Sequence, residues 1–136
     1  MITAVDSSVL LDVFGADPTF GLRLRKAVRS CLSEGRLIAC EVVWAEVGRF
    51  FLSPAAAQDA MDRLGVEYSP IELKTALAAS RVWKGYRGRG RQRAWGVADF
   101  LVGAHALSQA ERLLTRDRGF YRTYFSRLRV LDPGKT

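Results

Sequence analysis

Short apolar runs alternate along this chain with longer segments whose apolar residues recur every three or four positions. Buried strands are predicted for the apolar runs at residues 2–5, 37–40, 66–69, 112–115 and 128–131. The periodic segments predict helices over residues 7–13, 17–35, 41–52, 54–65, 70–85 and 98–109, with a short one after Gly119. Strands that alternate with helices favour a three-layer α/β/α fold with a mostly parallel five-stranded sheet.

The length and composition indicate one globular domain over residues 1–136. Hydrophobic residues make up 49% and charged residues 26% of the chain, a balance that excludes a disordered or fibrous protein. Neither a basic, apolar leader nor an apolar stretch of membrane-spanning length is seen. Cys31 and Cys40 lack metal or redox spacing and are expected to be reduced and structural. We therefore expect a cytoplasmic protein that does not enter a membrane.

The charge balance points to a polyanionic partner. The formal net charge is +7, and 17 of the 21 basic residues are arginines, which suit bidentate contact with phosphates. A GC-rich coding sequence is an alternative source of the arginine excess. Residues 85–96 hold four glycines and four arginines and predict a loop that could contact RNA through Arg87, Arg89, Arg91 and Arg93. Tyr86 and Trp95 flank this loop, where they could stack on bases or simply pack in the core.

Four acidic residues occur where chemistry is expected in a parallel sheet, which binds its ligands beyond the carboxyl ends of its strands. Asp6 ends the first predicted strand and Asp117 follows the fourth. Asp99 opens the helix that leads into the fourth strand, and Glu46 interrupts an apolar helix. Each has an ordinary explanation as a helix cap, a turn residue or, for Glu46, a partner of Arg49.

A divalent metal explains the acids jointly. Mg²⁺ takes hard oxygen ligands, often one or two carboxylates, and its charge relieves repulsion among them. Metal-held carboxylates surrounded by arginines suit hydrolysis of a phosphodiester. His105 lies six residues after Asp99, about 240° around the helix, so the two are expected to point to different sides.

Four motifs resemble those of the PIN domain, and most of all its VapC branch, the toxin ribonucleases of type II toxin–antitoxin pairs. The resemblance extends from Ile2 to about Leu131. The motifs that carry it are Ala4-Val-Asp-Ser-Ser-Val-Leu-Leu-Asp12, Trp44-Ala-Glu-Val47, Ala98-Asp-Phe-Leu-Val-Gly-Ala-His-Ala106 and Leu113-Leu-Thr-Arg-Asp-Arg-Gly-Phe-Tyr121.

The resemblance implies catalytic roles for Asp6, Glu46, Asp99 and Asp117, with Asp6, Asp99 and Asp117 as ligands of Mg²⁺ or Mn²⁺. It also implies a supporting role for Thr115. The family usually has Asn two residues after its first acid; Ser8 stands there in this chain and is expected to support the same region.

The sequence therefore predicts a metal-dependent endoribonuclease that acts as a toxin, forms a homodimer and is held inactive by a VapB-like antitoxin. Two alternatives remain open. One is a PIN nuclease of RNA maturation without an antitoxin; the other is a non-catalytic basic module that binds nucleic acid or protein.

Overall fold

A single five-stranded sheet organises the protein, whose computed structural model describes residues 1–87 and 95–133. Its strands are β1 (Ile2–Val5), β2 (Arg36–Ala39), β3 (Val66–Tyr68), β4 (Arg112–Leu114) and β5 (Val130–Leu131). The helices of the described residues are α1 (Ser7–Phe14), α2 (Gly21–Glu34), α3 (Glu41–Gly48), α4 (Pro54–Leu64), α5 (Leu73–Arg87), α6 (Val97–Gln109) and α7 (Arg118–Tyr124).

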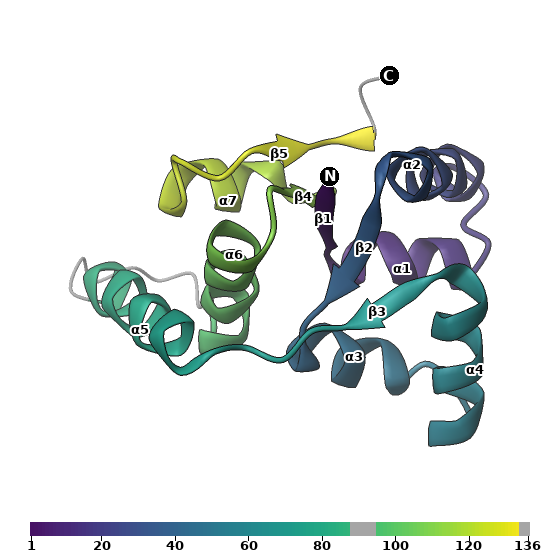
Figure 1. Ribbon diagram of the computed structural model, residues 1–136, viewed down its shortest axis with the longest axis horizontal. Helices are drawn as coiled ribbons and strands as arrows, with labels where there is room; N and C mark the ends of the chain where they lie inside the picture. Colours follow the sequence, from purple (N-terminus) through teal and green to yellow (C-terminus); the bar gives the residue numbers. More distant parts are fainter. Residues whose placement is uncertain (88–94, 134–136) are drawn as a thin grey trace.

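All neighbouring strands pair in parallel, in the order β3-β2-β1-β4-β5. The chain moves outward from β1 through β2 to β3, then returns to the other side of β1 for β4 and β5. Right-handed crossovers in opposite directions place helices on both faces of the sheet. Figure 1 shows α1, α2 and α4 on one side of the strands and α5, α6 and α7 on the other. The predicted three-layer α/β/α fold is confirmed.

Helix α6 forms the centre of the layer that covers β1 and β4. Phe100 on this helix is completely buried, and its ring meets those of Tyr86, Phe120, Tyr124 and Phe125. Gly103 lies so close to the last of these rings that a Cβ on it would stand 2.3 Å from the Phe125 Cε2 atom. This aromatic cluster therefore fixes α7 against the start of α6.

Several predicted boundaries were wrong, among them the starts of the helix predicted from Pro70, which begins at Leu73, and of the strand predicted from Leu128, which begins at Val130. Helix α2 begins at Gly21 rather than near Pro18, because the Asp17 carboxylate accepts hydrogen bonds from the backbone N–H groups of Thr19 and Phe20 and holds a turn there. Helix α3 ends at Gly48 rather than at residue 52. Residues 85–87 belong to α5 rather than to a loop, and Cys40 is the N-cap of α3 rather than part of a strand.

Arg112 is a buried cation inside the fold, exposed by only 5%. Its guanidinium donates to Thr3 Oγ1 at 2.8 Å and to Glu34 Oε1 at 3.0 Å, so β4 is tied to β1 and to the end of α2. Cys31 and Cys40 are both buried free thiols. Burial raises the pKa of both thiols, so they stay protonated and act as small apolar groups.

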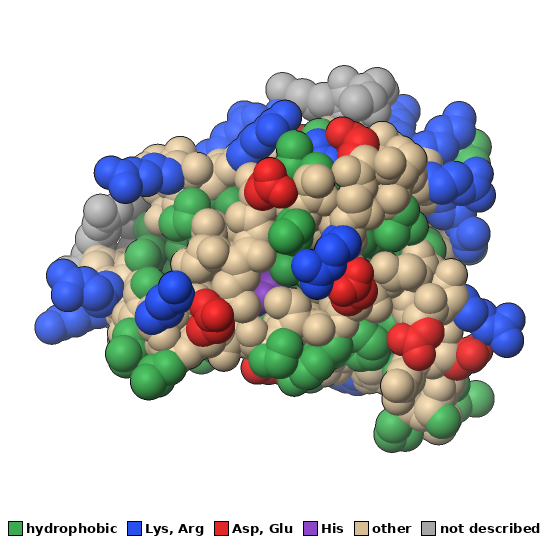
Figure 2. All heavy atoms as spheres, viewed as in Figure 1, with side chains coloured by type: hydrophobic (Ala, Val, Ile, Leu, Met, Phe, Trp, Pro, Cys, Tyr) green, Lys and Arg blue, Asp and Glu red, His purple; other side chains and the backbone are tan. Residues whose placement is uncertain are grey.

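Basic side chains are prominent on the face that Figure 2 shows, where Lys and Arg lie along the left, upper and right edges and acidic side chains are scattered between them. Within the part of the chain that the structure describes, no helix has both the length and the apolar character needed to cross a membrane.

Candidate active site

Asp6 is the centre of the candidate site. It directly follows β1 and is the N-cap of α1, so its Oδ1 atom accepts a hydrogen bond from the Ser7 backbone N–H at 2.8 Å. Its Oδ2 atom accepts from Thr115 Oγ1 at 2.8 Å and from the Tyr121 hydroxyl at 3.2 Å. Ser8 Oγ also lies 3.4 Å from Oδ2. The side chain is thus both a helix cap and the meeting point of three segments.

A short hydrogen-bond chain connects Asp6 to Asp117. The Asp117 backbone N–H donates to Thr115 Oγ1 at 2.9 Å, and the Thr115 hydroxyl in turn donates to Asp6. Thr115 is completely buried just after β4, so its hydroxyl cannot exchange these hydrogen bonds for bonds to bulk water. This arrangement brings the start of α7, where Asp117 is the N-cap, against the end of β1.

Glu46 lies at the exposed rim of the site, not in the apolar core. Its Oε1 atom accepts a hydrogen bond from Ser7 Oγ at 3.0 Å. Loss of hydration raises the pKa of Glu46, and the nearby charges of Asp6 and Asp99 raise it further, whereas the Ser7 hydrogen bond lowers it. The acid that interrupts the apolar sequence of α3 therefore faces other acids.

Asp99 occupies the third position of α6 rather than its N-cap, which is Gly96. Its Oδ2 atom accepts a hydrogen bond from the Gly96 backbone N–H at 3.1 Å, so it stabilises the first turn of the helix. Its charge also raises the pKa values of Glu46 and Tyr121. Asp99 thus combines the capping role with a place beside the other acids.

Electrostatic interactions connect the four sequence-predicted acids in series, from Asp117 to Asp6, from Asp6 to Glu46 and from Glu46 to Asp99. Burial raises the pKa of Asp6 above its ordinary value, three hydrogen bonds oppose that shift, and the charge of Asp117 adds to it. Burial also raises the pKa of Tyr121 well above its ordinary value, with further contributions from Asp6, Asp99 and Asp117. Gathering negative charge in a partly buried region costs free energy, which a bound cation would recover.

The donor atoms fit a hard divalent cation better than a soft one. They are carboxylate and hydroxyl oxygens, the ligands that Mg²⁺ and Mn²⁺ prefer, and no thiol is among them. Among the described residues, no group of three or more Asp, Glu, His or Cys side chains is arranged so that it could hold a metal ion. The geometry therefore suits an ion held by one or two carboxylates, the usual arrangement for Mg²⁺.

Sequence reasoning missed two residues of the site, Ser7 and Tyr121. Ser7 joins two acids, because its backbone N–H binds Asp6 while its hydroxyl binds Glu46. Tyr121 is buried with its hydroxyl against Asp6. Its spacing of four residues from Asp117, about one helical turn, was the available signal.

Arg116, next to Asp117, is directed away from the acids. It forms an ion pair with Asp12 and its guanidinium carbon lies 3.9 Å from the centre of the Phe20 ring. Asp12 thus links α1 to the segment after β4 and is engaged outside the acidic cluster.

The predicted RNA contacts are only partly visible. Arg89, Arg91 and Arg93 lie outside the described residues, and Arg87 is the last residue of α5. Tyr86 is buried, and its hydroxyl accepts a hydrogen bond from the Trp95 backbone N–H at 3.0 Å. Trp95 stacks against Phe120 with ring centres 4.5 Å apart. Tyr86 thus belongs to the core and Trp95, which is partly buried, packs against it, so the structure favours the packing role over the base-stacking role for these two residues.

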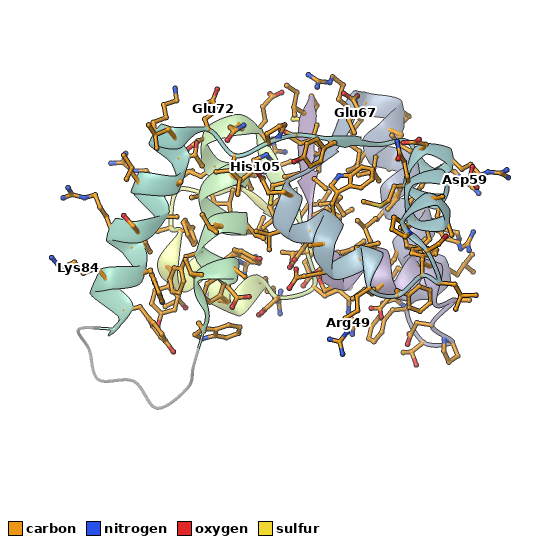
Figure 3. The ribbon with its side chains drawn as sticks, turned by 90° about the horizontal axis from the view of Figure 1, so that it is seen from below. Arg49, Asp59, Glu67, Glu72, Lys84 and His105 are labelled. Atoms are coloured by element: carbon orange, nitrogen blue, oxygen red, sulfur yellow. The ribbon has the colours of Figure 1, made fainter. Side chains whose placement is uncertain are left out.

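His105 is a buried structural residue. Its Nε2 atom lies 3.0 Å from Ser69 Oγ, and burial lowers its pKa despite the opposing charge of Glu41. His105 lies on α6, and Figure 3 shows it in the upper middle of the view, whereas Arg49 lies at the lower edge. The structure thus places this histidine apart from the acids, as its helical spacing from Asp99 predicts.

We expect His105→Gln to cleave RNA within about threefold of the wild type and to lose less stability in acid. The pKa of folded His105 lies below its ordinary value of 6.5, so the unfolded chain binds a proton more readily and stability falls as pH drops through 6.5. Melting temperatures at pH 7.5 and pH 5 measure this difference. Equal pH dependence of both proteins would contradict the assignment of a neutral, buried imidazole.

The family is established by a sequence profile of the PIN domain, which matches residues 3–126. The chain belongs to the PIN domain family. Its fold is shared by solved structures of toxin–antitoxin complexes at low sequence identity. None of the curated protein sequences compared with the chain is a significant match.

Three solved structures illustrate this similarity of fold. VapBC2 from Rickettsia felis, bound to a DNA fragment from its promoter, has a TM-score of 0.76 at 15% identity, over 97% of this chain and 98% of that chain. VapBC-1 from nontypeable Haemophilus influenzae has a TM-score of 0.75 at 19% identity, over 99% and 100%. VapC20 from Mycobacterium tuberculosis, a toxin that cleaves the Sarcin-Ricin loop, has a TM-score of 0.52 at 15% identity, over 82% and 86%.

Proposed function

We propose that this protein is a metal-dependent endoribonuclease and the toxin of a type II toxin–antitoxin pair in the cytoplasm. The observation that carries the proposal is that electrostatic interactions connect Asp117, Asp6, Glu46 and Asp99 in series, with Tyr121 within range of the three aspartates, in a PIN domain. Such a concentration of carboxylates is costly without a cation, and a basic surface around it suits a polyanionic substrate.

Asp6, Asp99 and Asp117 are the residues proposed to hold Mg²⁺ or Mn²⁺, one or two of them directly and the rest through bound water, with Ser8 and Thr115 in support. A bound divalent ion supplies charge that favours deprotonation of water and stabilises a phosphodiester under attack. Glu46 is proposed to accept a proton from an incoming water. It lies at the solvent-exposed rim, and its raised pKa makes its carboxylate a better proton acceptor. Hydrolysis by water predicts products with a 5′-phosphate and a 3′-hydroxyl.

The substrate is proposed to be RNA, held by arginines through its phosphates. Arg87, Arg89, Arg91 and Arg93 remain the proposed contacts, because four cations in a glycine-rich segment can follow a flexible backbone. Replacing all four by Ala is expected to flatten the salt dependence of RNA binding. An unchanged slope would remove this segment from the proposed interface.

Exposed apolar surfaces support two protein partners. A groove of about 350 Å³ between α3 and α4 is lined by Trp44, Phe51, Leu52 and Ala57. Leu52 is fully exposed at this groove. This groove suits the apolar face of an antitoxin helix, whose arginine or lysine could then enter the acidic site. On the opposite layer, Leu73 and Leu77 of α5 and Leu107 of α6 are exposed and suit a homodimer contact.

The test is to incubate the purified protein with single-stranded RNA in Mg²⁺, Mn²⁺ or EDTA. We expect cleavage with either metal, 5′-phosphate products and no cleavage in EDTA. Binding of RNA without cleavage under any metal condition would favour the non-catalytic module instead.

Co-purification, combined with the same cleavage assay, can decide whether an antitoxin exists. The product of the adjacent small gene should co-purify with the protein and suppress its cleavage of RNA. If cleavage is metal-dependent but the two proteins do not associate, the maturation nuclease becomes the better interpretation.

A further inference from the structure

Tyr121 is the contact of Asp6 that the motif comparison leaves unexplained. It lies on α7, is exposed by only 2%, and places its hydroxyl 3.2 Å from Asp6 Oδ2. Because a carboxylate is acceptor-only when ionised, the tyrosine hydroxyl must be the donor in this contact. The buried Tyr121 hydroxyl therefore donates its one hydrogen bond to Asp6, the central acid of the site.

The two oxygens of Asp6 have unequal surroundings. Oδ2 receives hydrogen bonds from the Thr115 and Tyr121 hydroxyls, with the longer Ser8 contact in addition. Oδ1 receives one from the described residues, the Ser7 backbone N–H. Each carboxylate oxygen offers about two lone-pair directions, so Oδ2 is saturated while Oδ1 retains an open one.

Ser7 links Oδ1 to Glu46, whereas Thr115 links Oδ2 to Asp117. Ser7, which binds Oδ1 through its backbone, donates its own hydroxyl to Glu46, and the charge of Asp99 acts on that same glutamate. Oδ1 therefore faces the edge where a cation would meet further carboxylates. Oδ2 faces the interior, where the aromatic cluster supports the Tyr121 ring through Phe120 and Phe125.

We propose that Tyr121 is a positioning residue that fixes the rotation of the Asp6 carboxylate, presents Oδ1 to a divalent cation and thereby sets the cation affinity of the site. The inference rests on the proposed function for the presence of the metal. Without the Tyr121 hydroxyl, Oδ1 would keep the Ser7 backbone N–H, and Oδ2 would keep Thr115 and the longer Ser8 contact. The Tyr121 hydroxyl adds a donor from α7 and so restricts the remaining rotation of the carboxylate. Groups that orient a metal ligand in this way typically change affinity 10- to 100-fold.

The test compares Tyr121→Phe with Tyr124→Phe in the full chain. Both lose one hydroxyl from α7, but Tyr124 packs in the aromatic cluster with Phe100 and Phe120 instead of against Asp6. Mn²⁺ binding without RNA is measured by electron paramagnetic resonance or calorimetry. We expect affinity about tenfold weaker for Tyr121→Phe and unchanged for Tyr124→Phe, with cleavage by Tyr121→Phe largely restored at saturating Mn²⁺.

Stability is controlled by recording each variant's melting temperature in EDTA and its rise on addition of Mn²⁺. The rise, referenced to the variant's own metal-free value, reports affinity even where the hydroxyl contributes to folding. Tyr121→Met, which also removes the hydroxyl, provides a second variant if the Phe ring packs poorly.

Each outcome has a distinct meaning. Affinity of Tyr121→Phe within twofold of the wild type overturns the positioning role and leaves the nuclease proposal intact. Wild-type protein that binds Mn²⁺ tightly, loses that binding in Tyr121→Phe, yet cleaves no RNA overturns the nuclease proposal alone. Wild-type protein that binds no Mn²⁺ overturns the positioning role directly.

Discussion

Asp6→Asn is expected to reduce RNA cleavage by at least about 100-fold, because losing a charged ligand removes several kcal/mol of charge stabilisation. The fold should survive this change. The Thr115 and Tyr121 hydroxyls, which now donate to Oδ2, can rotate to accept from the new amide. Initial rates on a labelled RNA in saturating Mn²⁺ measure the loss.

The same substitution should change stability in opposite directions with and without metal. Burial raises the pKa of Asp6, so the ionised side chain weakens the folded state at pH 7, and the neutral amide should melt at the same or a higher temperature in EDTA. Added Mn²⁺ should raise the melting temperature of the wild type only, because a ligand stabilises the state that binds it.

The control for this pair of measurements is Asp59→Asn. Asp59 is exposed on α4, where it pairs with Arg63, and Figure 3 shows it at the edge of the molecule. The variant carries the same change of charge and should retain both cleavage and the Mn²⁺-induced rise in melting temperature. An active Asp6→Asn protein would defeat the proposed role of this carboxylate.

Phe100→Ala is expected to lower the free energy of unfolding by about 3–5 kcal/mol, the usual cost of emptying a buried phenylalanine site. The effect should lie at the upper end because four other rings meet Phe100 and would be left facing a cavity. Against a total of about 5–15 kcal/mol for a typical domain, this leaves little stability.

Urea unfolding followed by circular dichroism measures the change. Leu107→Ala on the same helix is the control, because that side chain is 41% exposed and should cost much less. Similar midpoints for the two variants would mean that the aromatic cluster is not the main support of α6. Because Asp99 precedes Phe100, the loss should also lower cleavage at temperatures where the wild type is fully active.

The fold could be predicted from the sequence because its signals are local. Short apolar runs such as residues 2–5 and 37–40 are strands in the structure to within a residue, and Pro54 and Gly65 mark the limits of α4 as expected. Boundaries failed where side chains compete with the backbone. The Asp17 carboxylate holds Thr19 and Phe20 in a turn and delays the start of α2.

The order of acids along the chain also identified which residues to bring together. Asp6 and Asp117 follow strands that are neighbours in the sheet, so parallel pairing alone brings them to one edge. Glu46 was recognised because an isolated acid in an apolar helix needs a partner. That partner, the Ser7 hydroxyl, is 39 residues away in sequence and had no local signal.

By itself, the sequence determined the α/β layers, the parallel sheet and the identity of the four acids, since strand and helix periodicity and residue type are properties of short segments. Only the tertiary structure decided how Asp6 is held and which residues hold it. The contacts of Asp6 with Thr115 and Tyr121 span 109 and 115 residues and depend on the pairing of β4 with β1 and on the packing of α7 against β5. Hydrogen bonds of this kind are set by distances of a few tenths of an ångström, which arise only when the whole core has packed.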